Sequence, residues 1–235
     1  MIRPTVIPAL RDLLRSGPSA HDAAHLNWAT GVPLRLGTTH EWFNEAEDHR
    51  TWNAPIAVLA ALAACAVHDR VLRRVVWIGD RVFPFPAFLD RRVLVASVFI
   101  DPPSPDARLW AIDMALRSQT PTCVVADGQG LTLAASRRLR LAAGSGRGLG
   151  LLARPGAEHR LLSAATTRWR VEPHRTERPG CVAWSVTLLR NKDLPLLAAE
   201  PRSWILESDD AQGLVVVPPL VAGGTDRAAV RAVAS

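Results

Sequence analysis

The residues in this sequence most suited to a chemical role are its many arginines, whose number and spacing could serve to bind phosphate or acidic groups. The chain has 28 lysines and arginines against 22 aspartates and glutamates, a formal net charge of +6, and Lys192 is its single lysine. Arginine makes bidentate contacts with phosphate and stacks on aromatic rings. An arginine-rich basic chain is therefore typical of proteins that bind nucleic acid or an acidic partner, although a solvated basic surface would have the same charge.

The arginines concentrate between residues 134 and 178, a segment that contains ten arginines and only three glutamates. Arg168 and Arg170 flank Trp169, an arrangement that offers phosphate contacts beside a ring on which a base can stack. We predict a DNA-binding set of Arg137, Arg138, Arg140, Arg168, Trp169, Arg170, Arg175 and Arg178. Strand alternation also permits a second interpretation, in which Trp169 packs in the core with Val171 and the arginines solvate the other face. A polymerase-subunit surface is a competing use of the same arginines.

No set of residues with the spacing of a catalytic or metal site accompanies these arginines. His21 and His25 have the i, i+4 spacing of helical metal ligands, but no third ligand stands convincingly near them. His40 and His49 have no identifiable nucleophile with an orienting acid. The three cysteines are far apart and form no CxxC pair. We expect neither enzymatic activity, nor a bound metal, nor a cofactor.

Strands alternate with helices along the middle of the chain. The pattern predicts strands at 38–43, 75–78, 93–100, 122–126 and 148–153, and helices at 55–69, 106–118 and 133–143. Alternation of this kind is typical of βαβ units with a parallel sheet. Two later segments, 166–171 and 182–189, alternate apolar and polar residues, and short edge strands are expected at 204–206 and 214–217. The predicted fold is α/β, with a central, mostly parallel sheet flanked by helices and with antiparallel strands on the C-terminal side.

We divide the chain into an N-terminal helix and linker (1–30), a core domain (31–220) and a tail (221–235). The N-terminal helix places Ile7, Leu10, Leu13 and Leu14 on one apolar face, which we assign to partner binding; packing on the protein's own sheet is the alternative. No apolar run reaches the roughly 18 residues of a membrane span, so a cytoplasmic protein is the simplest expectation.

The order of elements resembles a RecA-type ATPase core, in which the connection from the first strand to the Ala-rich helix is the phosphate loop. Such a loop needs glycines, a lysine and a Ser or Thr. Residues 44–53 contain no glycine and no lysine, and Glu45, Glu47 and Asp48 would repel a triphosphate. Asp127, at the end of an apolar strand, is either a metal-supporting aspartate or a turn residue. We interpret these four acidic residues as a degenerate nucleotide site.

Three segments resemble the ImuA family of RecA-like accessory proteins of bacterial mutagenic translesion synthesis. They are residues 131–143 (LTLAASRRLRLAA), 167–171 (TRWRV) and 184–192 (WSVTLLRNK). The resemblance implies a RecA-like core and a role in the SOS response to DNA damage. It also implies a Y-family polymerase-like subunit of the ImuB type and an error-prone C-family polymerase as partners, with RecA and single-stranded DNA as further candidates.

Three hypotheses follow for the function of the chain. The leading one is a non-catalytic RecA-like adaptor that helps a mutagenic polymerase assembly to act at damaged DNA. The second is a RecA-like ATPase with an unconventional nucleotide site. The third is a regulator of RecA or of cell division that binds protein only.

Overall fold

The computed structural model describes residues 25–44, 52–86, 89–118, 120–193, 202–209 and 213–217. Its strands are β1 (His25–Leu26), β2 (Leu34–Arg35), β3 (Thr38–Asn44), β4 (Arg74–Ile78), β5 (Ser97–Ile100), β6 (Thr122–Asp127), β7 (Leu149–Pro155), β8 (Thr167–His174), β9 (Ala183–Asn191), β10 (Arg202–Asp209) and β11 (Gly213–Val217). Its helices are α2 (Ile56–His68), α3 (Arg91–Ala96), α4 (Pro105–Leu116) and α5 (Leu133–Gly146), with short 3-10 turns η1 (Asp80–Val82) and η3 (Gly156–Arg160). None of the helices in these ranges is long and apolar enough to cross a membrane.

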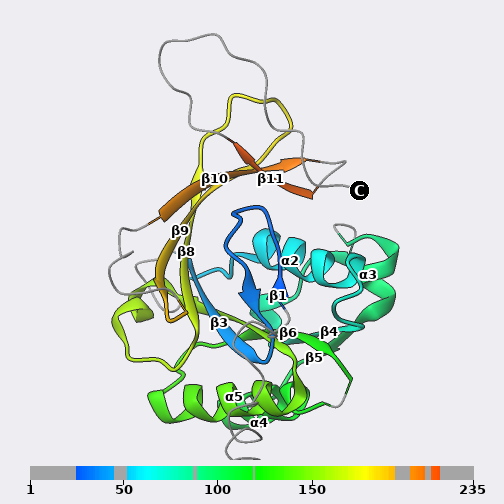
Figure 1. Cartoon of the computed structure of the whole chain (residues 1–235), viewed down its shortest axis with the longest axis vertical. Helices are drawn as coiled ribbons and strands as arrows, with labels where there is room; N and C mark the ends of the chain where they lie inside the picture. Colours follow the sequence, from blue (N-terminus) through cyan, green and yellow to red (C-terminus); the bar gives the residue numbers. More distant parts are fainter. Residues whose placement is uncertain are drawn as a thin grey trace, which may run out of the picture.

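Nine strands form one sheet in the order β11-β10-β9-β8-β3-β7-β6-β4-β5 (Figure 1). Each neighbouring pair from β8 through β3, β7, β6 and β4 to β5 is parallel. The pairs formed by β8, β9, β10 and β11 are antiparallel. The predicted α/β architecture is therefore confirmed, including the antiparallel strands on the C-terminal side.

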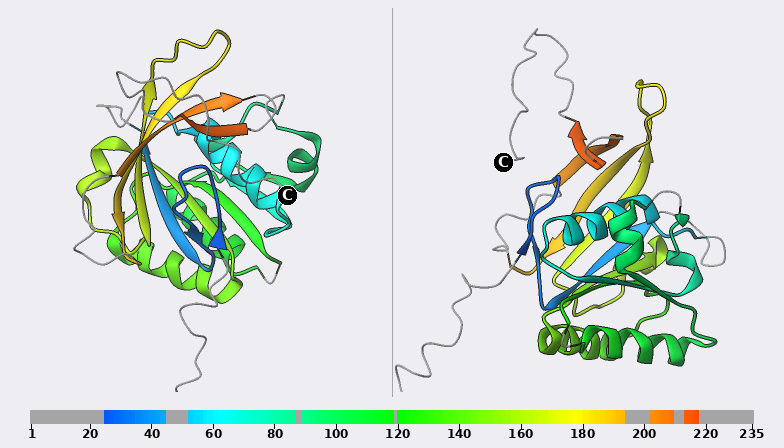
Figure 2. Two further views of the ribbon diagram at one scale, coloured as in Figure 1. Left: turned by 45° about the horizontal axis from the view of Figure 1, so that its top comes forward. Right: turned by 90° about the vertical axis from the view of Figure 1, so that its right-hand side faces the viewer.

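Helices cover both faces of the parallel part of the sheet, with α2 and α3 on one face and α4 and α5 on the other (Figure 2). The side chains of β6 alternate between the two layers: Cys123 and Val125 join the core under α2, whereas Val124 and Ala126 join the core over α4 and α5. Every residue of β6 and β7 is buried. A strand covered on both faces must be apolar at nearly every position, which explains the continuous apolar runs in the sequence.

Side-chain caps determine where three of the helices begin. Ser104 Oγ accepts a hydrogen bond from the backbone N–H of Ala107 at 3.2 Å at the start of α4, and Thr132 caps α5 in the same way. Asp90 Oδ1 accepts from the N–H groups of Arg92 and Val93 at 2.7 and 3.1 Å and so starts α3. The prediction of a strand over 93–100 was therefore wrong in its first half. The cap outweighed the strand preference of Val93 and its neighbours.

Tryptophans fill the junction where the parallel strands meet the antiparallel ones. Trp42 of β3 and Trp169 of β8 are register partners, and their rings stack at 5.3 Å with an interplanar angle of 6°. Trp28, from the β1–β2 hairpin, meets both rings edge-on at 5.4 and 5.1 Å. Trp204 of β10 adds a tilted contact with Trp169 at 5.9 Å. This cluster, Trp28, Trp42, Trp169 and Trp204, is called the tryptophan cluster below, and it joins the β1–β2 hairpin to β3, β8 and β10.

Candidate functional site

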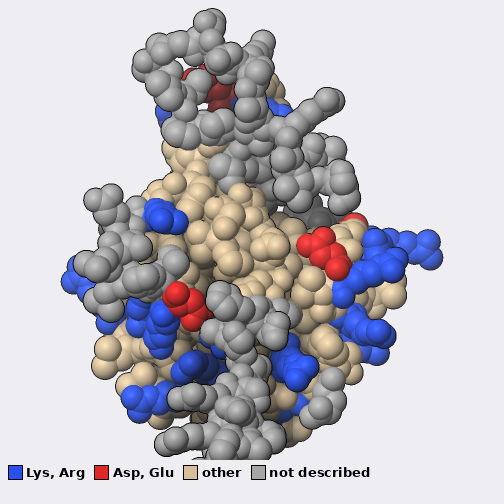
Figure 3. Space-filling model, in the orientation of Figure 1, with Lys and Arg blue, Asp and Glu red and all other residues tan. Residues whose placement is uncertain are grey.

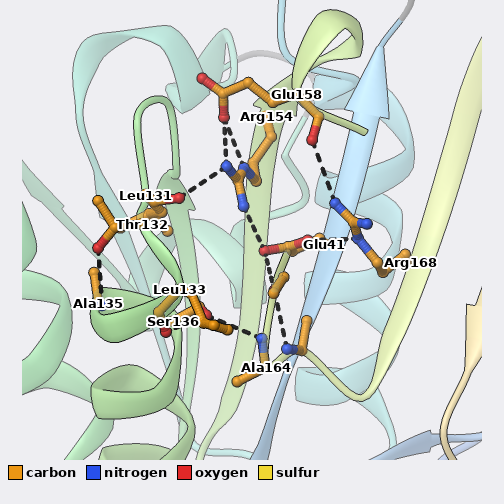
Figure 4. Close-up of polar contacts among 12 residues, drawn as sticks. Glu41, Leu131, Thr132, Leu133, Ala135, Ser136, Arg154, Glu158, Ala164 and Arg168 are labelled. Atoms are coloured by element: carbon orange, nitrogen blue, oxygen red, sulfur yellow. Dashed lines mark hydrogen bonds and ion pairs between the residues drawn. The ribbon is translucent and has the colours of Figure 1, made fainter. Parts of the chain in front are cut away.

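A buried ion-pair cluster lies between β3, β7, β8 and η3 (Figure 4). Glu41 accepts hydrogen bonds from Arg154 at 2.7 Å and Ser163 at 2.6 Å through one oxygen, and from Arg168 at 2.8 Å through the other. Arg154 also contacts Glu158 at 2.7 Å and donates to the carbonyl of Leu131 at 3.0 Å. Two carboxylates and two guanidinium groups thus share one nearly dry site with their charges balanced, as the burial of charged groups requires.

This cluster corrects the prediction that Arg168 and Trp169 bind DNA. Arg168 is 7% exposed and its guanidinium lies 4.7 Å from the centre of the Phe43 ring in addition to pairing with Glu41. Trp169 is fully buried, and its indole N–H donates to Thr167 Oγ1 at 2.7 Å. Neither side chain can reach a phosphate or a base. The alternative interpretation, with Trp169 in the core beside Val171, is correct, but Arg168 also faces inward because Glu41 balances its charge.

Asp127 lies at the carboxyl end of β6, at the edge where a RecA-type core binds nucleotide. Its side chain is 1% exposed, accepts from Arg108 at 2.7 Å and from the N–H of Gln129 at 2.9 Å, and lies 4.0 Å from Arg81 Nε. Burial, the largest influence, raises the pKa of Asp127, while the Gln129 N–H and the two arginines act in the opposite direction. One carboxylate oxygen is therefore engaged by the arginines and the other by a backbone N–H.

Trp52, in the connection that precedes α2, contacts the residues around Asp127. Its indole N–H donates to Gln129 Oε1 at 3.1 Å, and its carbonyl accepts from Arg81 at 3.4 Å. The Arg81 guanidinium also lies 5.7 Å from the centre of the Trp52 ring. A single contact chain thus links Trp52 to Arg81 and through it to Asp127. The predicted residues Glu45, Glu47 and Asp48 lie outside the described part of the chain.

The predicted arginines of α5 are exposed, and two residues of β9 and its end extend them into a basic cluster. Arg190 and Lys192 donate to the carbonyls of residues 163–165 at 2.9–3.1 Å. Burial lowers the pKa of Lys192, and the nearby charges of Arg190, Arg140 and Arg137 lower it further. We call Arg137, Arg140, Arg190 and Lys192 the α5–β9 basic cluster. The sequence prediction missed the last two because they lie beyond the arginine-rich segment.

The other predicted arginines are separated from this cluster. Arg138 is exposed, but its Nε pairs with Asp113 at 3.1 Å. Arg170 is half-buried on β8, whereas Arg175 and Arg178 belong to the β8–β9 turn, where Arg178 pairs with Glu207 at 3.1 Å. Figures 1 and 2 place this turn at the opposite end of the molecule from α5. The eight residues predicted to bind DNA therefore form no continuous surface.

The histidines and acidic residues of the described ranges include no group of three that could hold a metal ion. His40 is buried, and its ring nitrogens lie 2.7 Å from Thr167 Oγ1 and 3.1 Å from Thr38 Oγ1. Burial lowers the pKa of His40 to about 4. His40 is thus a neutral core residue beside the tryptophan cluster, while His21, His49 and the helix face of Ile7, Leu10, Leu13 and Leu14 lie outside the described residues.

The sequence is similar to Protein ImuA of two strains of Caulobacter vibrioides, NA1000 / CB15N and ATCC 19089 / CB 15. Each is 29% identical to this chain over 198 residues, which cover 77% of this chain and 79% of the relative. No protein-family model matches the chain. The similarity supports the resemblance to the ImuA family.

Proposed function

We propose that this chain is a non-catalytic RecA-like adaptor in damage-induced mutagenic translesion DNA synthesis, with a role like that of ImuA. The proposal is supported by similarity to ImuA over 77% of the chain. It is also supported by the element order, a buried strand, a connection, a helix and then parallel and antiparallel strands. Its partners would be a Y-family polymerase-like subunit of the ImuB type and an error-prone C-family polymerase, with RecA as a further candidate.

The observation that carries the non-catalytic part of the proposal is the set of contacts around Asp127. In a nucleotide site at this strand end, the aspartate must be open to support a magnesium ion. Here Arg108 and the N–H of Gln129 occupy both carboxylate oxygens at 2.7 and 2.9 Å. A divalent cation would have to displace the Arg108 guanidinium from the buried Asp127 carboxylate. If the guanidinium stayed 2.7 Å from that carboxylate, the metal ion and Arg108 would repel each other.

ATP binding and hydrolysis by the purified full chain test this conclusion against the ATPase hypothesis. We expect no hydrolysis above that of a blank, for the unchanged protein and for Asp127→Asn alike. An Arg108→Gln variant is tested as well, because it removes the positive charge beside Asp127 and keeps a neutral hydrogen-bond donor there. Hydrolysis by the unchanged protein that disappears in Asp127→Asn, with folding checked by circular dichroism, would overturn the adaptor proposal in favour of the ATPase.

We infer that the α5–β9 basic cluster contacts single-stranded DNA. Arg137 and Arg140 are exposed on α5, and the described residues place no carboxylate within ion-pair distance of either. Each phosphate that a variant no longer neutralises should reduce the slope of log affinity against log salt by about 0.7 for single strands. Arg137→Ala with Arg140→Ala should therefore flatten the salt dependence of oligothymidylate binding.

A matched control separates this cluster from other arginines. Arg175→Ala removes an exposed arginine of the β8–β9 turn and should leave the slope unchanged. Binding that does not change with salt, or that is abolished equally in the control, would contradict the DNA contact. Co-purification of the ImuB-type subunit with the unchanged chain and with the same variants distinguishes the adaptor from a regulator that binds protein only. The adaptor should retain the polymerase subunit, whereas the regulator should not.

A further inference from the structure

The open edge of the sheet at β5 carries an unusual concentration of exposed apolar side chains. Val95, at the end of α3, is 78% exposed, and Leu94, Val98 and Phe99 are 39–40% exposed. Val98 and Phe99 are neighbours in one strand, so their side chains lie on opposite faces of the sheet, and Phe99 lies on the face covered by α3. A run of large apolar side chains at one edge of a domain is typical of a docking surface rather than of scattered solvent exposure.

The backbone of β5 is available for pairing along its outer side. In the described part of the chain β5 pairs with β4 alone. The Ile100 carbonyl accepts from Gly79 N–H at 2.9 Å, on the side of β4. Strand alternation then directs the N–H and carbonyl of Phe99 outward. Phe99 itself is held in place, because its ring stacks on Trp77 at 6.1 Å and meets Phe83 edge-on at 5.4 Å. The edge thus offers a template for another strand.

A basic pocket adjoins the amino end of this edge strand. It has a volume of about 750 Å³ and is lined by Val67, Arg73, Arg74, Arg91, Arg92, Val95, Ala96 and Thr120. The lining thus has four arginines and no carboxylate. Among the described residues no carboxylate lies within ion-pair distance of Arg73, Arg74 or Arg91. Basic side chains gather over α3 at the right of Figure 3. Val95 belongs both to the pocket lining and to the exposed apolar residues, so the two features adjoin.

We propose that the β5 edge and this pocket bind an extended acidic segment of a partner protein, which adds a strand to the sheet beside β5. Main-chain hydrogen bonds to the edge would hold the segment, its apolar side chains would cover Val98 on one face of the sheet, and its carboxylates, which alternate to the other face, would pair with the arginines of α3. The mixture favours a peptide over nucleic acid, because a strand edge and aliphatic side chains offer nothing to phosphates or bases. This surface is distinct from Asp127 and from the α5–β9 basic cluster.

Fluorescence anisotropy with synthetic peptides and the full chain tests the proposal. The probe is a labelled peptide of alternating Val and Glu, and the matched control probes replace Glu by Ser or by Lys. We expect the Val-Glu peptide alone to bind. Arg91→Ala with Arg92→Ala should weaken it about tenfold, because the double change removes two partly exposed ion pairs with the peptide. Arg137→Ala with Arg140→Ala, on the α5–β9 basic cluster, should leave its affinity unchanged.

Backbone amide hydrogen exchange gives a second measurement, because electrostatic attraction without strand pairing would not slow exchange in β5. Binding of the Val-Glu peptide should slow exchange in residues 97–100, and this protection should persist in part in Arg91→Ala because the strand pairing remains. Equal binding of the Ser peptide, or an affinity that does not depend on Arg91 and Arg92, would overturn the proposal. So would displacement of the peptide by oligothymidylate through the same arginines, since the surface would then bind nucleic acid.

Discussion

Replacement of Glu41 by alanine is the perturbation that most directly tests the buried ion-pair cluster. The carboxylate accepts from Arg154, Ser163 and Arg168, so its removal leaves two guanidinium groups with one buried carboxylate, that of Glu158. Arg154 has no access to solvent and cannot turn outward to recover hydration. We therefore expect Glu41→Ala to be among the most destabilising single substitutions in the described part of the chain.

The magnitude follows from the cost of leaving a buried charge without its partner, which is about 3–5 kcal/mol. Domains of this size are stable by about 5–15 kcal/mol in total, so the substitution removes a large share of the folding free energy. At roughly 2–4 °C per kcal/mol for chains of 150–250 residues, Tm should fall by about 6–20 °C. The equivalent destabilisation in urea should appear as a lower midpoint with an unchanged slope.

An exposed ion pair provides the control for this measurement. Arg35 and Asp193 are 3.5 Å apart with side chains 40% and 43% exposed, and Arg35→Ala should cost no more than about 1 kcal/mol. The double variant Glu41→Ala, Arg154→Ala should lose less than the sum of the two single variants, because each single change leaves the other partner's buried charge without its counter-ion and the double variant removes both charges. If Glu41→Ala costs no more than Arg35→Ala, or if the two changes are additive, the cluster does not hold the strands as described.

Three further predictions concern the core. Trp169→Ala should cost about 3–5 kcal/mol in urea unfolding by opening a cavity against the tryptophan cluster, whereas Trp110→Ala, at a ring 61% exposed, should cost less than about 0.5 kcal/mol; equal costs would contradict this. Burial lowers the pKa of His40 to about 4 from 6.5, so the unfolded chain binds the proton first and stability should fall as pH drops from about 6.5 to about 4, by up to about 3 kcal/mol. His40→Gln should lose that part of the pH profile, and an unchanged profile would show that His40 is not its source. On α5, Gly146→Ala should destabilise, because its Cβ would lie 2.1 Å from the Leu116 carbonyl oxygen, while Gly144→Ala, with 3.7 Å of space, should gain up to about 1 kcal/mol in the same unfolding measurement; the reverse order would refute the packing.

The parallel part of the fold could be predicted from the sequence because its rules are local. Segments such as 123–126 are apolar at each position, as a strand covered on both faces requires. Helix ends were less predictable. α5 continues past the predicted end at residue 143 to Gly146, where the carbonyls of α4 and its following turn leave no room for a side chain.

The charged centre of the molecule could not be predicted from spacing. Glu41 and Arg154 are 113 positions apart in the chain, and nothing local indicates that either is buried. The arginine-rich segment therefore suggested a surface, whereas Arg154 and Arg168 are core residues. The same limit applies to Arg190 and Lys192, which reach the basic cluster on α5 only through the pairing of β9 with β8.

The tryptophan cluster also gives the protein an optical property. The chain has eight tryptophans and no tyrosine, so its ultraviolet emission comes from indole rings alone. Four of these rings lie within 5.1–5.9 Å of a neighbour, close enough to share excitation energy. Because they come from the β1–β2 hairpin, β3, β8 and β10, their joint emission reports whether the parallel and antiparallel halves of the sheet are docked. Trp110 on α4 is exposed, so a soluble quencher such as iodide can reach it. Its quenching therefore gives a separate signal from the outer helical layer in the same fluorescence experiment.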